Sequence, residues 1–256
     1  FKAVELVRNK EAAAVVSAGH SGATMTLATL RIGRLPHISK PALATLMPSV
    51  TSHKTLVLDV GAVTDCTPQN LYEFGAMGEA YSQKIMGIRS PKVGLLSNGS
   101  EDSKGNALTK EAFGLLKELN GFVGNVEGRD IFNGNVNVVV CDGFTGNILL
   151  KTSEGVVSTI FTMMRAHIRK SLPAKLGALM MKKKVFGNMK KQVDYAEYGG
   201  APLLGINGTG VISHGTSNAT AIKNAILVAE NMVRNKVKES IVQALEQDRV
   251  IQMEQA

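Results

Sequence analysis

The chain of 256 residues is 44% apolar and 20% charged, a balance that supports a buried core and excludes an intrinsically disordered protein. No stretch reaches the roughly 18 consecutive apolar residues of a membrane-spanning helix, and no apolar signal peptide opens the chain, so an integral membrane protein is excluded. The net charge is +8, and the two cysteines, Cys66 and Cys141, form no CxxC pair. This cysteine usage argues against a disulfide framework or a zinc site and favours a reducing, cytoplasmic setting.

A helical pattern is already under way over residues 1–9, and the chain opens on Phe1 rather than Met, which predicts that an N-terminal segment precedes it. Short apolar runs then follow, each leading into a glycine-containing loop and a helical pattern. The predicted strands are 14–17, 55–60, 92–96, 136–140 and 210–213. The helices after the first three strands end near residues 32, 86 and 119, a long helix follows residue 147, and a last one runs from 219 to 245.

Strands that alternate with helices predict an α/β fold with a largely parallel sheet, covered by helices on both faces because the strands are continuous apolar runs. Residues 42–47 predict a further strand, and the flanking Pro41 and Pro48 favour an edge position for it. We expect residues 1–256 to form a single α/β domain, from which a helical, basic and amphipathic arm projects over residues 158–191.

Polar side chains gather in the loops that follow the predicted strands. In a parallel sheet these loops lie outside the carboxyl ends of the strands, so we expect them to line one functional edge. Glycines let the backbone approach a ligand and helix N-termini offer N–H groups to an anion, so the pattern favours a phosphate or carboxylate site. For any single loop an ordinary turn is the better explanation, and only the five loops together favour a functional edge. The polar residues concerned are Ser21, Asp59, Asn98, Ser100, Glu101, Asp102, Lys104, Asn106, Thr145, Asn147, His214, Thr216, Ser217 and Asn218.

The common catalytic motifs are missing from the sequence. It contains no GxGxxG, P-loop, GxSxG or HExxH pattern, so we predict no metal site. His20 and His214 are the histidines that lie in the polar loops. For each of them we give a ligand-binding role and a surface role equal weight. Cys141 ends a strand beside the predicted edge and is either a nucleophile or, as we favour, a buried core residue.

Lys104 is the cation of greatest interest, because it lies in an acidic loop flanked by glycines. One interpretation is a solvated turn lysine paired with Glu101 or Asp102. The other is a functional lysine that holds phosphate or stabilises developing negative charge.

Seven sequence motifs in chain order closely resemble those of the bacterial acyl-(acyl carrier protein):phosphate acyltransferases, the PlsX type. They are SAGHSGATM (17–25), LDVGA (58–62), LLSNGSEDSKGN (95–106), FVGNVEGRD (122–130), CDGFTGN (141–147), YGGAPLLG (198–205) and SHGTSNATA (213–221). The matches cover nearly the whole chain.

The resemblance implies an enzyme that moves a fatty acyl group from acyl carrier protein to inorganic phosphate. The acyl-phosphate product feeds the glycerol-3-phosphate acyltransferase of phospholipid synthesis. It also implies a Rossmann-like, three-layer α/β/α fold similar to phosphate acetyltransferases and isocitrate-dehydrogenase-like enzymes. Members of the family are cytoplasmic homodimers that associate peripherally with the inner face of the cell membrane.

By the matched motifs, Lys104 and Asn147 are the expected catalytic residues, and for Asn147 a helix cap is the alternative. No metal ion or organic cofactor is implied, because phosphate is itself a nucleophile. The expected substrate- and phosphate-binding residues are Gly19, His20, Ser21, Gly22, Asn98, Ser100, Glu101, Asp102, Gly143, Thr145, Gly146, His214, Gly215, Thr216, Ser217 and Asn218.

The chain departs from the family pattern in three places. The family carries an N-terminal region, with a first strand and a glycine-rich loop, before the position of Phe1. His20 and Val63 stand where Asn is common. A histidine can replace the asparagine as a hydrogen-bond donor, but a valine side chain cannot.

The predicted arm is basic and amphipathic. Residues 155–193 contain no Asp or Glu and nine Lys or Arg residues. Pro173 can open a helix, after which the apolar residues fall on one face. We predict that this face contacts an anionic membrane, with a dimer interface as the alternative and nucleic acid not expected. The predicted membrane-contact residues are Leu172, Leu176, Leu179, Met180, Lys182, Lys183 and Lys184.

Three other functions stay open at this point. A phosphate acyltransferase that uses short-chain acyl-CoA is the nearest alternative. A metal- and NAD-dependent dehydrogenase of similar fold needs a ligand set that the sequence does not offer. A non-enzymatic scaffold docked on a membrane needs the glycine loops to be turns and nothing more.

Overall fold

The computed structural model describes residues 1–51, 53–193 and 199–255. A sheet of eight strands lies at the centre of these described residues. The strand order across the sheet is β1-β8-β7-β2-β3-β6-β4-β5. The strands are β1 (Val15–Ser17), β2 (Ala42–Met47), β3 (Thr55–Leu58), β4 (Val93–Leu96), β5 (Phe122–Val126), β6 (Val138–Val140), β7 (Ala201–Leu204) and β8 (Gly210–Ile212).

Helices follow most of the strands and confirm the predicted α/β alternation. The helices of the sheet region are α1 (Lys2–Arg8), α2 (Ser21–Arg31), α3 (Pro68–Ile85), α4 (Ala107–Leu116), α5 (Asp130–Asn133), α10 (Ala219–Arg234) and α11 (Val237–Gln255). The remaining helical segments are α6 (Gly143–Ile168), α7 (Leu172–Met181), the π-helix η1 (Lys182–Gly187) and α8 (Asn188–Val193).

The sheet is mixed, with four parallel pairings among the seven that join the described strands. β3, β6, β4 and β5 form one parallel block, and β1 pairs parallel with β8. β2 is antiparallel to both of its neighbours, β3 and β7, and β7 is antiparallel to β8. The prediction of a largely parallel sheet therefore holds for each block, while the blocks are joined by antiparallel strands.

The predicted edge position of residues 42–47 is wrong. The strand exists as β2, but it lies in the middle of the sheet between β7 and β3. Pro41 and Pro48 both lie just outside the strand, so neither removes an N–H from its hydrogen-bond ladder. The edge strands are β1 and β5, and neither β5 nor β7 was predicted as a strand.

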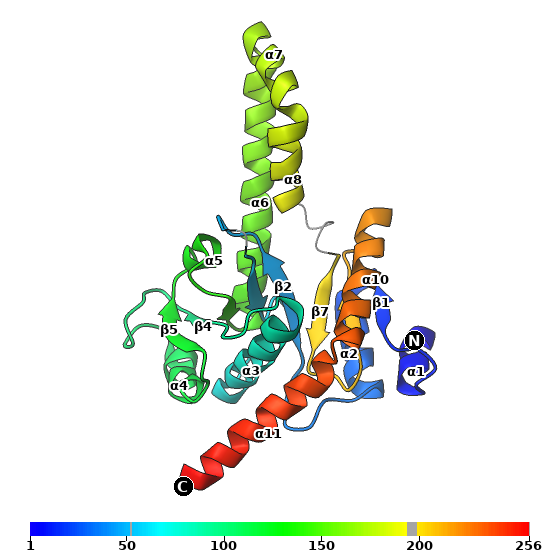
Figure 1. Ribbon diagram of the computed structural model, residues 1–256, viewed down its shortest axis with the longest axis vertical. Helices are drawn as coiled ribbons and strands as arrows, with labels where there is room; N and C mark the ends of the chain where they lie inside the picture. Colours follow the sequence, from blue (N-terminus) through cyan, green and yellow to red (C-terminus); the bar gives the residue numbers. More distant parts are fainter. Residues whose placement is uncertain (52, 194–198, 256) are drawn as a thin grey trace.

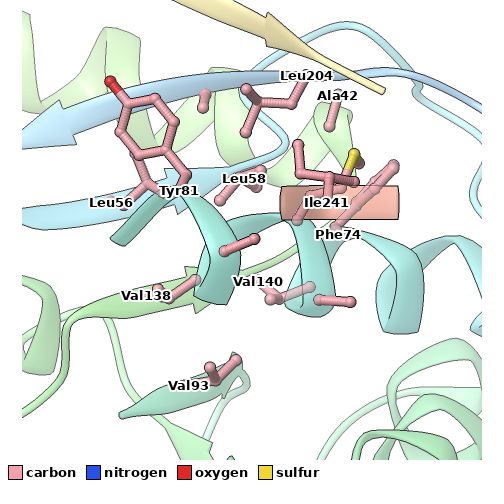
Figure 2. Packing of buried hydrophobic residues seen from close by; sticks show 14 of the residues in the cluster. Ala42, Leu56, Leu58, Phe74, Tyr81, Val93, Val138, Val140, Leu204 and Ile241 are labelled. Carbon is pink, nitrogen blue, oxygen red and sulfur yellow. The ribbon is translucent and has the colours of Figure 1, made fainter. Parts of the chain in front are cut away.

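Two apolar cores lie on opposite faces of the sheet and give the three-layer arrangement. On one face, helices α3, α4, α10 and α11 cover a cluster that includes Leu56, Leu58, Val138 and Val140. Figure 2 shows these four side chains close to helix α3. On the other face, helices α2, α5 and α6 cover a second cluster that includes Val57. Leu56 and Leu58 face one core and Val57 faces the other, as the alternation of a strand requires.

Helix α3 is the central helix of the first core and packs against both α4 and α11. Pro68 is at its first turn, and Thr67 and Asn70 form a capping box that starts the helix. Gly78 lets α3 approach the sheet closely, because a Cβ there would lie 2.5 Å from the side chain of Val138.

The last predicted helix is in fact two. α10 ends at Arg234 and α11 begins at Val237, with Lys236 at φ 53 between them. A left-handed residue cannot continue an α-helix, so the chain turns and α11 packs on α3.

The predicted arm is formed by α6, which extends beyond the sheet, and by α7 at its far end, from which η1 and α8 lead back (Figure 1). Pro173 opens α7 as predicted, with Ser171 as the N-cap. No helix among the described residues is long and apolar enough to cross a membrane.

Candidate functional site

Strand direction divides the polar loops into two groups. Three antiparallel pairings separate β3 from β8, and an odd number of reversals leaves β1 and β8 running opposite to β3, β6, β4 and β5. In Figure 1, α10 accordingly runs downward from its N-terminus, whereas α6 runs upward. The prediction that the glycine loops share one edge is wrong: 59–63, 97–106 and 141–147 share one, and 18–22 and 213–218 lie at the other.

Lys104 lies at the first of these edges, in the loop between β4 and α4, and its side chain is exposed. Its backbone N–H donates to the carbonyl oxygen of Glu101 at 3.0 Å, which closes a turn. The loop is held again where the N–H of Gly105 donates to Oδ1 of Asn98 at 3.0 Å. Asn106 then caps α4 by accepting the N–H of Thr109. Lys104 thus lies on a loop that is hydrogen-bonded at several points.

Lys104 does not form the ion pair that the alternative interpretation, a solvated turn lysine, requires. Asp102 forms its ion pair with Lys117, at 3.8 Å, and in the described part of the chain Lys104 has no carboxylate within 4.0 Å. The stem of Lys104 instead packs over Gly99, where a Cβ would lie 2.9 Å from Cγ of Lys104 and 2.8 Å from Oε2 of Glu101. The ammonium group is therefore available to an anionic ligand.

Asn147 lies in the first turns of α6, which follows β6, and β6 pairs directly with the strand β4 that precedes Lys104. The N-cap of α6 is Asp142, whose carboxylate accepts the N–H and the hydroxyl of Thr145 at 2.9 and 2.7 Å. The alternative of Asn147 as a helix cap is therefore wrong. Its exposed side chain lies against Gly61, where a Cβ would be 3.6 Å from Cβ of Asn147.

Two glycines place α6 directly on the backbone that follows β3. A Cβ on Gly146 would lie 1.9 Å from the carbonyl oxygen of Asp59, and one on Gly143 would lie 2.5 Å from its carboxylate. The N–H of Gly143 also donates to the carbonyl of Val63 at 2.8 Å. The position of Asn147 is thus tied to the 59–63 loop.

Asp59 organises that loop from inside the protein, where it is fully buried. Its carboxylate accepts backbone N–H groups of Leu43, Gly61, Ala62 and Val63 at 2.6–3.2 Å. Burial raises the pKa of the Asp59 carboxyl, and the four backbone N–H groups oppose that rise. Asp59 is therefore a structural support of the site rather than a group that reaches a ligand.

Side chains at the other edge cap two helices, α2 and α10. His20 is the N-cap of α2, where its Nδ1 accepts the N–H of Ala23 at 3.2 Å, and Asn218 caps α10 in the same way. Ser21 and Gly22 open α2, while Gly19 precedes it. The 213–218 loop approaches the 18–22 loop at Gly215, where a Cβ would lie 3.8 Å from the carbonyl oxygen of Ala18.

The 213–218 loop is closed by its own hydrogen bonds. Nδ1 of His214 lies 2.7 Å from Oγ1 of Thr216, and the N–H of Ser217 donates to the carbonyl of His214. The hydroxyl of Ser217 is buried without a hydrogen-bond partner. Among the other predicted ligand residues, Ser100 is exposed in the Lys104 loop. Tyr198, the first residue of one family motif, lies outside the described residues.

The cysteines are not nucleophile candidates. Cys141 is only 2% exposed, and burial raises the pKa of its thiol well above the ordinary value. Burial also raises the pKa of Cys66, to about 11. The interpretation of Cys141 as a core residue is therefore the better one.

The predicted membrane-contact residues all lie in the arm. Leu172, Leu176, Leu179 and Met180 of α7 are 66–87% exposed, and Lys182, Lys183 and Lys184 of η1 are exposed as well. The side chains of Lys190 and Lys191, which add to the predicted charge, lie outside the described residues.

Two polar residues at the Lys104 edge were missed in the sequence. Asn125 is a buried polar residue in β5, and Arg129 follows β5 and pairs with Glu127 at 2.7 Å. The signal was present in FVGNVEGRD, where an amide follows a glycine inside an apolar run. No group of three or more His, Cys, Asp or Glu side chains suited to a metal ion occurs within the described residues.

Solved structures show the same architecture. A phosphotransacetylase from Streptococcus pyogenes superposes with a TM-score of 0.55 and 24% identity, over 95% of this chain and 66% of its own. A branched-chain phosphotransacylase from Enterococcus faecalis V583 gives a TM-score of 0.54 and 16% identity, over 91% of this chain and 78% of its own. The chain thus has the α/β fold of the phosphotransacylases.

Sequence comparison narrows the class. The family described as "Fatty acid synthesis protein" matches residues 1–240. The phosphate acyltransferase of a Sulfurovum species is 77% identical over 243 residues, which are 93% of this chain and 74% of that protein. The phosphate acyltransferase of a Nitratiruptor species is 60% identical over 96% of this chain and 74% of its own length.

The chain therefore belongs to the phosphate acyltransferase family, whose members are acyltransferases of fatty acid and phospholipid synthesis. The resemblance seen in the sequence motifs is confirmed. Membership of this family sets aside the dehydrogenase and the non-enzymatic scaffold as functions.

Proposed function

We propose that the protein transfers a fatty acyl group from acyl carrier protein to inorganic phosphate, with Lys104 and Asn147 as catalytic residues. The observation that carries this proposal is their placement. A cation with no carboxylate partner among the described residues and an amide near a helix N-terminus follow adjacent strands, at the same sheet edge. A positive side chain and amide donors together suit a reaction in which negative charge develops.

The reaction needs no nucleophile from the protein. A phosphate oxygen attacks the thioester carbonyl carbon, and the carbonyl oxygen takes up the negative charge. The C–S bond then breaks and the new C–O bond remains, which gives acyl-phosphate. The departing thiolate takes the proton released by hydrogen phosphate, so the second product is the carrier thiol.

Each catalytic residue serves one part of this step. The ammonium group of Lys104 balances charge on the phosphate and on the oxyanion, and the Nδ2–H of Asn147 donates to one of these oxygens. The N-terminus of α6 adds a favourable dipole at the same place. The thiolate is a weak base, so its departure does not depend on a strong general acid.

The remaining ligand residues fall into two proposed sets, one at each edge. The first lines the reacting groups and consists of Asn98, Ser100, Glu101, Asp102, Gly143, Thr145 and Gly146. The second binds a phosphate group at the N-termini of α2 and α10 and consists of Gly19, His20, Ser21, Gly22, His214, Gly215, Thr216, Ser217 and Asn218.

A thiol-release assay tests the proposed reaction. We expect phosphate-dependent release of thiol from long-chain acyl carrier protein, and far slower release from short-chain acyl-CoA. The opposite preference would establish the short-chain acyl-CoA enzyme. K104A should lower turnover on the order of 10²–10³-fold, as loss of one preorganised donor does.

Two further variants complete that test. N147A should lower the rate with little loss of stability, because Asp142 rather than Asn147 caps the helix. K84A serves as the matched control: it removes an exposed lysine in the last turn of α3, leaves the pair of Asp102 with Lys117 in place, and should leave turnover unchanged. A folded K104A variant with wild-type turnover would remove Lys104 from the mechanism.

A homodimer is the proposed assembly. Helix α6 carries a row of apolar side chains, Phe144, Ile148, Val156, Ile160 and Met163, each 50–61% exposed in the single chain. A second copy that packs along this helix would remove the apolar row from water.

The end of the arm is proposed to dock peripherally on the inner face of the cell membrane. The leucine and methionine side chains of α7 supply apolar area, and the lysines of η1 attract anionic lipid at about 1 kcal/mol each. The enzyme would thereby release acyl-phosphate in the cytoplasm beside the glycerol-3-phosphate acyltransferase that consumes it.

Vesicle flotation tests the membrane proposal. We expect salt-sensitive binding to vesicles that contain phosphatidylglycerol, and loss of binding in the double variant L176E/L179E with the dimer intact. L30E, at an exposed leucine of α2 outside the arm, is the control and should bind normally. Normal binding of the double variant, or its dissociation into monomers, would show that the arm does not dock on lipid.

A further inference from the structure

Asn125 occupies an irregular position in the edge strand β5. Phe122 pairs with Val93 of β4, but Asn125 rather than Gly124 pairs with Leu95, so β5 contains one extra residue. Gly124 adopts φ +96, a conformation that side chains rarely allow. A bulge of this kind re-aims the side chain that follows it. The consequence is that Asn125 and Val126 are both buried although they are neighbours in one strand.

The amide of Asn125 reaches the turn that carries Lys104. Its Nδ2 donates to the carbonyl oxygen of Glu101 at 2.8 Å, and the same oxygen accepts the N–H of Lys104 at 3.0 Å. Two donors from different elements thus converge on one carbonyl. This hydrogen bond links the Lys104 loop to the neighbouring strand of the sheet.

The rest of the Asn125 side chain is poorly suited to a stabilising role. The residue is only 6% exposed, and its Oδ1 has no hydrogen-bond partner in the part of the chain that the structure describes. A buried acceptor left without a partner costs stability. The opposite amide orientation would set Oδ1 against the Glu101 carbonyl and is therefore worse. An apolar side chain would avoid this cost, so the single hydrogen bond to Glu101 is what distinguishes asparagine here.

We propose that Asn125 is a positioning residue that holds the Glu101–Lys104 turn and thereby places the Lys104 ammonium for the reaction. This inference rests on the proposed catalytic role of Lys104. The aliphatic stem of the Lys104 side chain packs over Gly99. If the turn is also held at Glu101, both the backbone and the stem of Lys104 are restrained, and the ammonium group has fewer positions to occupy. A displacement of about 1 Å in such a group can cost on the order of 10² in rate.

The test compares N125A with N137A, K104A and the double variant K104A/N125A. Asn137 is a matched control, because its Oδ1 accepts the N–H of Lys92 at 2.9 Å at the opposite, amino end of β4. Both single asparagine variants remove one hydrogen bond between a side chain and the backbone. N125L keeps the branched outline of the side chain but has no donor and buries no polar atom, and it is used if N125A does not fold.

We expect N125A to lower kcat at least about tenfold, while N137A leaves kcat within about twofold at a similar loss of thermal stability. In the K104A background, N125A should have less than about a twofold further effect, because the two residues act as one unit. Independently of activity, the backbone amide of Lys104 should exchange with solvent faster in N125A than in wild type or N137A.

The possible failures are distinct. If K104A is inactive but N125A behaves like N137A, the positioning role is overturned while the proposed function stands. If N125A costs as much in the K104A background as in wild type, Asn125 acts on something other than Lys104 and the inference is overturned. If K104A itself is fully active, the proposed catalytic role of Lys104 fails first, and the positioning role fails with it.

Discussion

Among the described glycines, Gly146 is the one at which an added Cβ would come closest to another atom. The glycine lies one residue before Asn147 in α6, and a Cβ on it would meet the carbonyl oxygen of Asp59 at 1.9 Å. Backbone rather than a flexible side-chain end stands in the way. The substitution G146A therefore cannot be absorbed by a rotamer change.

The size of the effect follows from that distance. Carbon–oxygen contacts of about 3.3 Å or more are the ordinary limit, so the first turn of α6 must move by at least about 1 Å away from the strand β3. Asn147 moves with it. Overpacking of this kind costs about 1–3 kcal/mol of stability, against which alanine regains up to about 1 kcal/mol of helix propensity. A shift of about 1 Å at the proposed catalytic amide lowers kcat on the order of 10²-fold.

The matched control is a helical glycine away from the proposed dimer face. Gly114 of α4 has no atom within 4 Å of an added Cβ, so G114A should raise stability by up to about 1 kcal/mol and leave kcat unchanged. Thermal unfolding and steady-state thiol release from acyl carrier protein measure both quantities. A G146A variant with wild-type melting temperature and kcat would refute the argument that the contact between α6 and β3 places Asn147.

The other predictions concern the reactivity of the two cysteines and the role of His20. Burial raises the pKa of both thiols, that of Cys66 to about 11. Cys66 and Cys141 should therefore resist iodoacetamide at about pH 8 in the folded enzyme. Cys66 should react faster as the pH approaches its pKa, because more of the thiol is then ionised. Rapid labelling of either thiol with loss of activity would contradict this. H20A should lower the free energy of unfolding by about 1 kcal/mol through loss of the α2 cap, whereas H20S keeps a capping oxygen and should not. If the His20 ring binds a phosphate group at its own edge of the sheet, H20S should weaken phosphate binding measured by titration calorimetry, and wild-type binding in H20S would limit His20 to capping.

Much of the fold could be predicted because burial leaves a local signature. The continuous apolar runs at 55–60 and 136–140 became β3 and β6, and Pro173 opened a helix as expected. β5 and β7 were missed because glycine, asparagine and proline interrupt their apolar pattern. The break between α10 and α11 was missed because no glycine or proline marks it, and a lysine takes the left-handed conformation instead.

The candidate site was predicted only in part. The loop that follows an apolar run is visible in the sequence, which is why Lys104 and Asn147 could be named with the help of the family motifs. The choice between a cap and a ligand-binding amide at Asn147 depends on where α6 begins. Only the hydrogen bonds of Asp142 answer that question.

By itself, the sequence determined the α/β class, the positions of most strands and helices, and the family, because each of these leaves its mark in neighbouring residues. The tertiary structure alone decided which strands pair and in which direction. The central place of β2 sends β1 and β8 opposite to β3, and so divides the polar loops between two edges. It also decided that the amide of Asn125 meets the turn of Lys104. Strand order and direction depend on contacts between residues far apart in the chain, and a run of apolar residues looks the same in either direction.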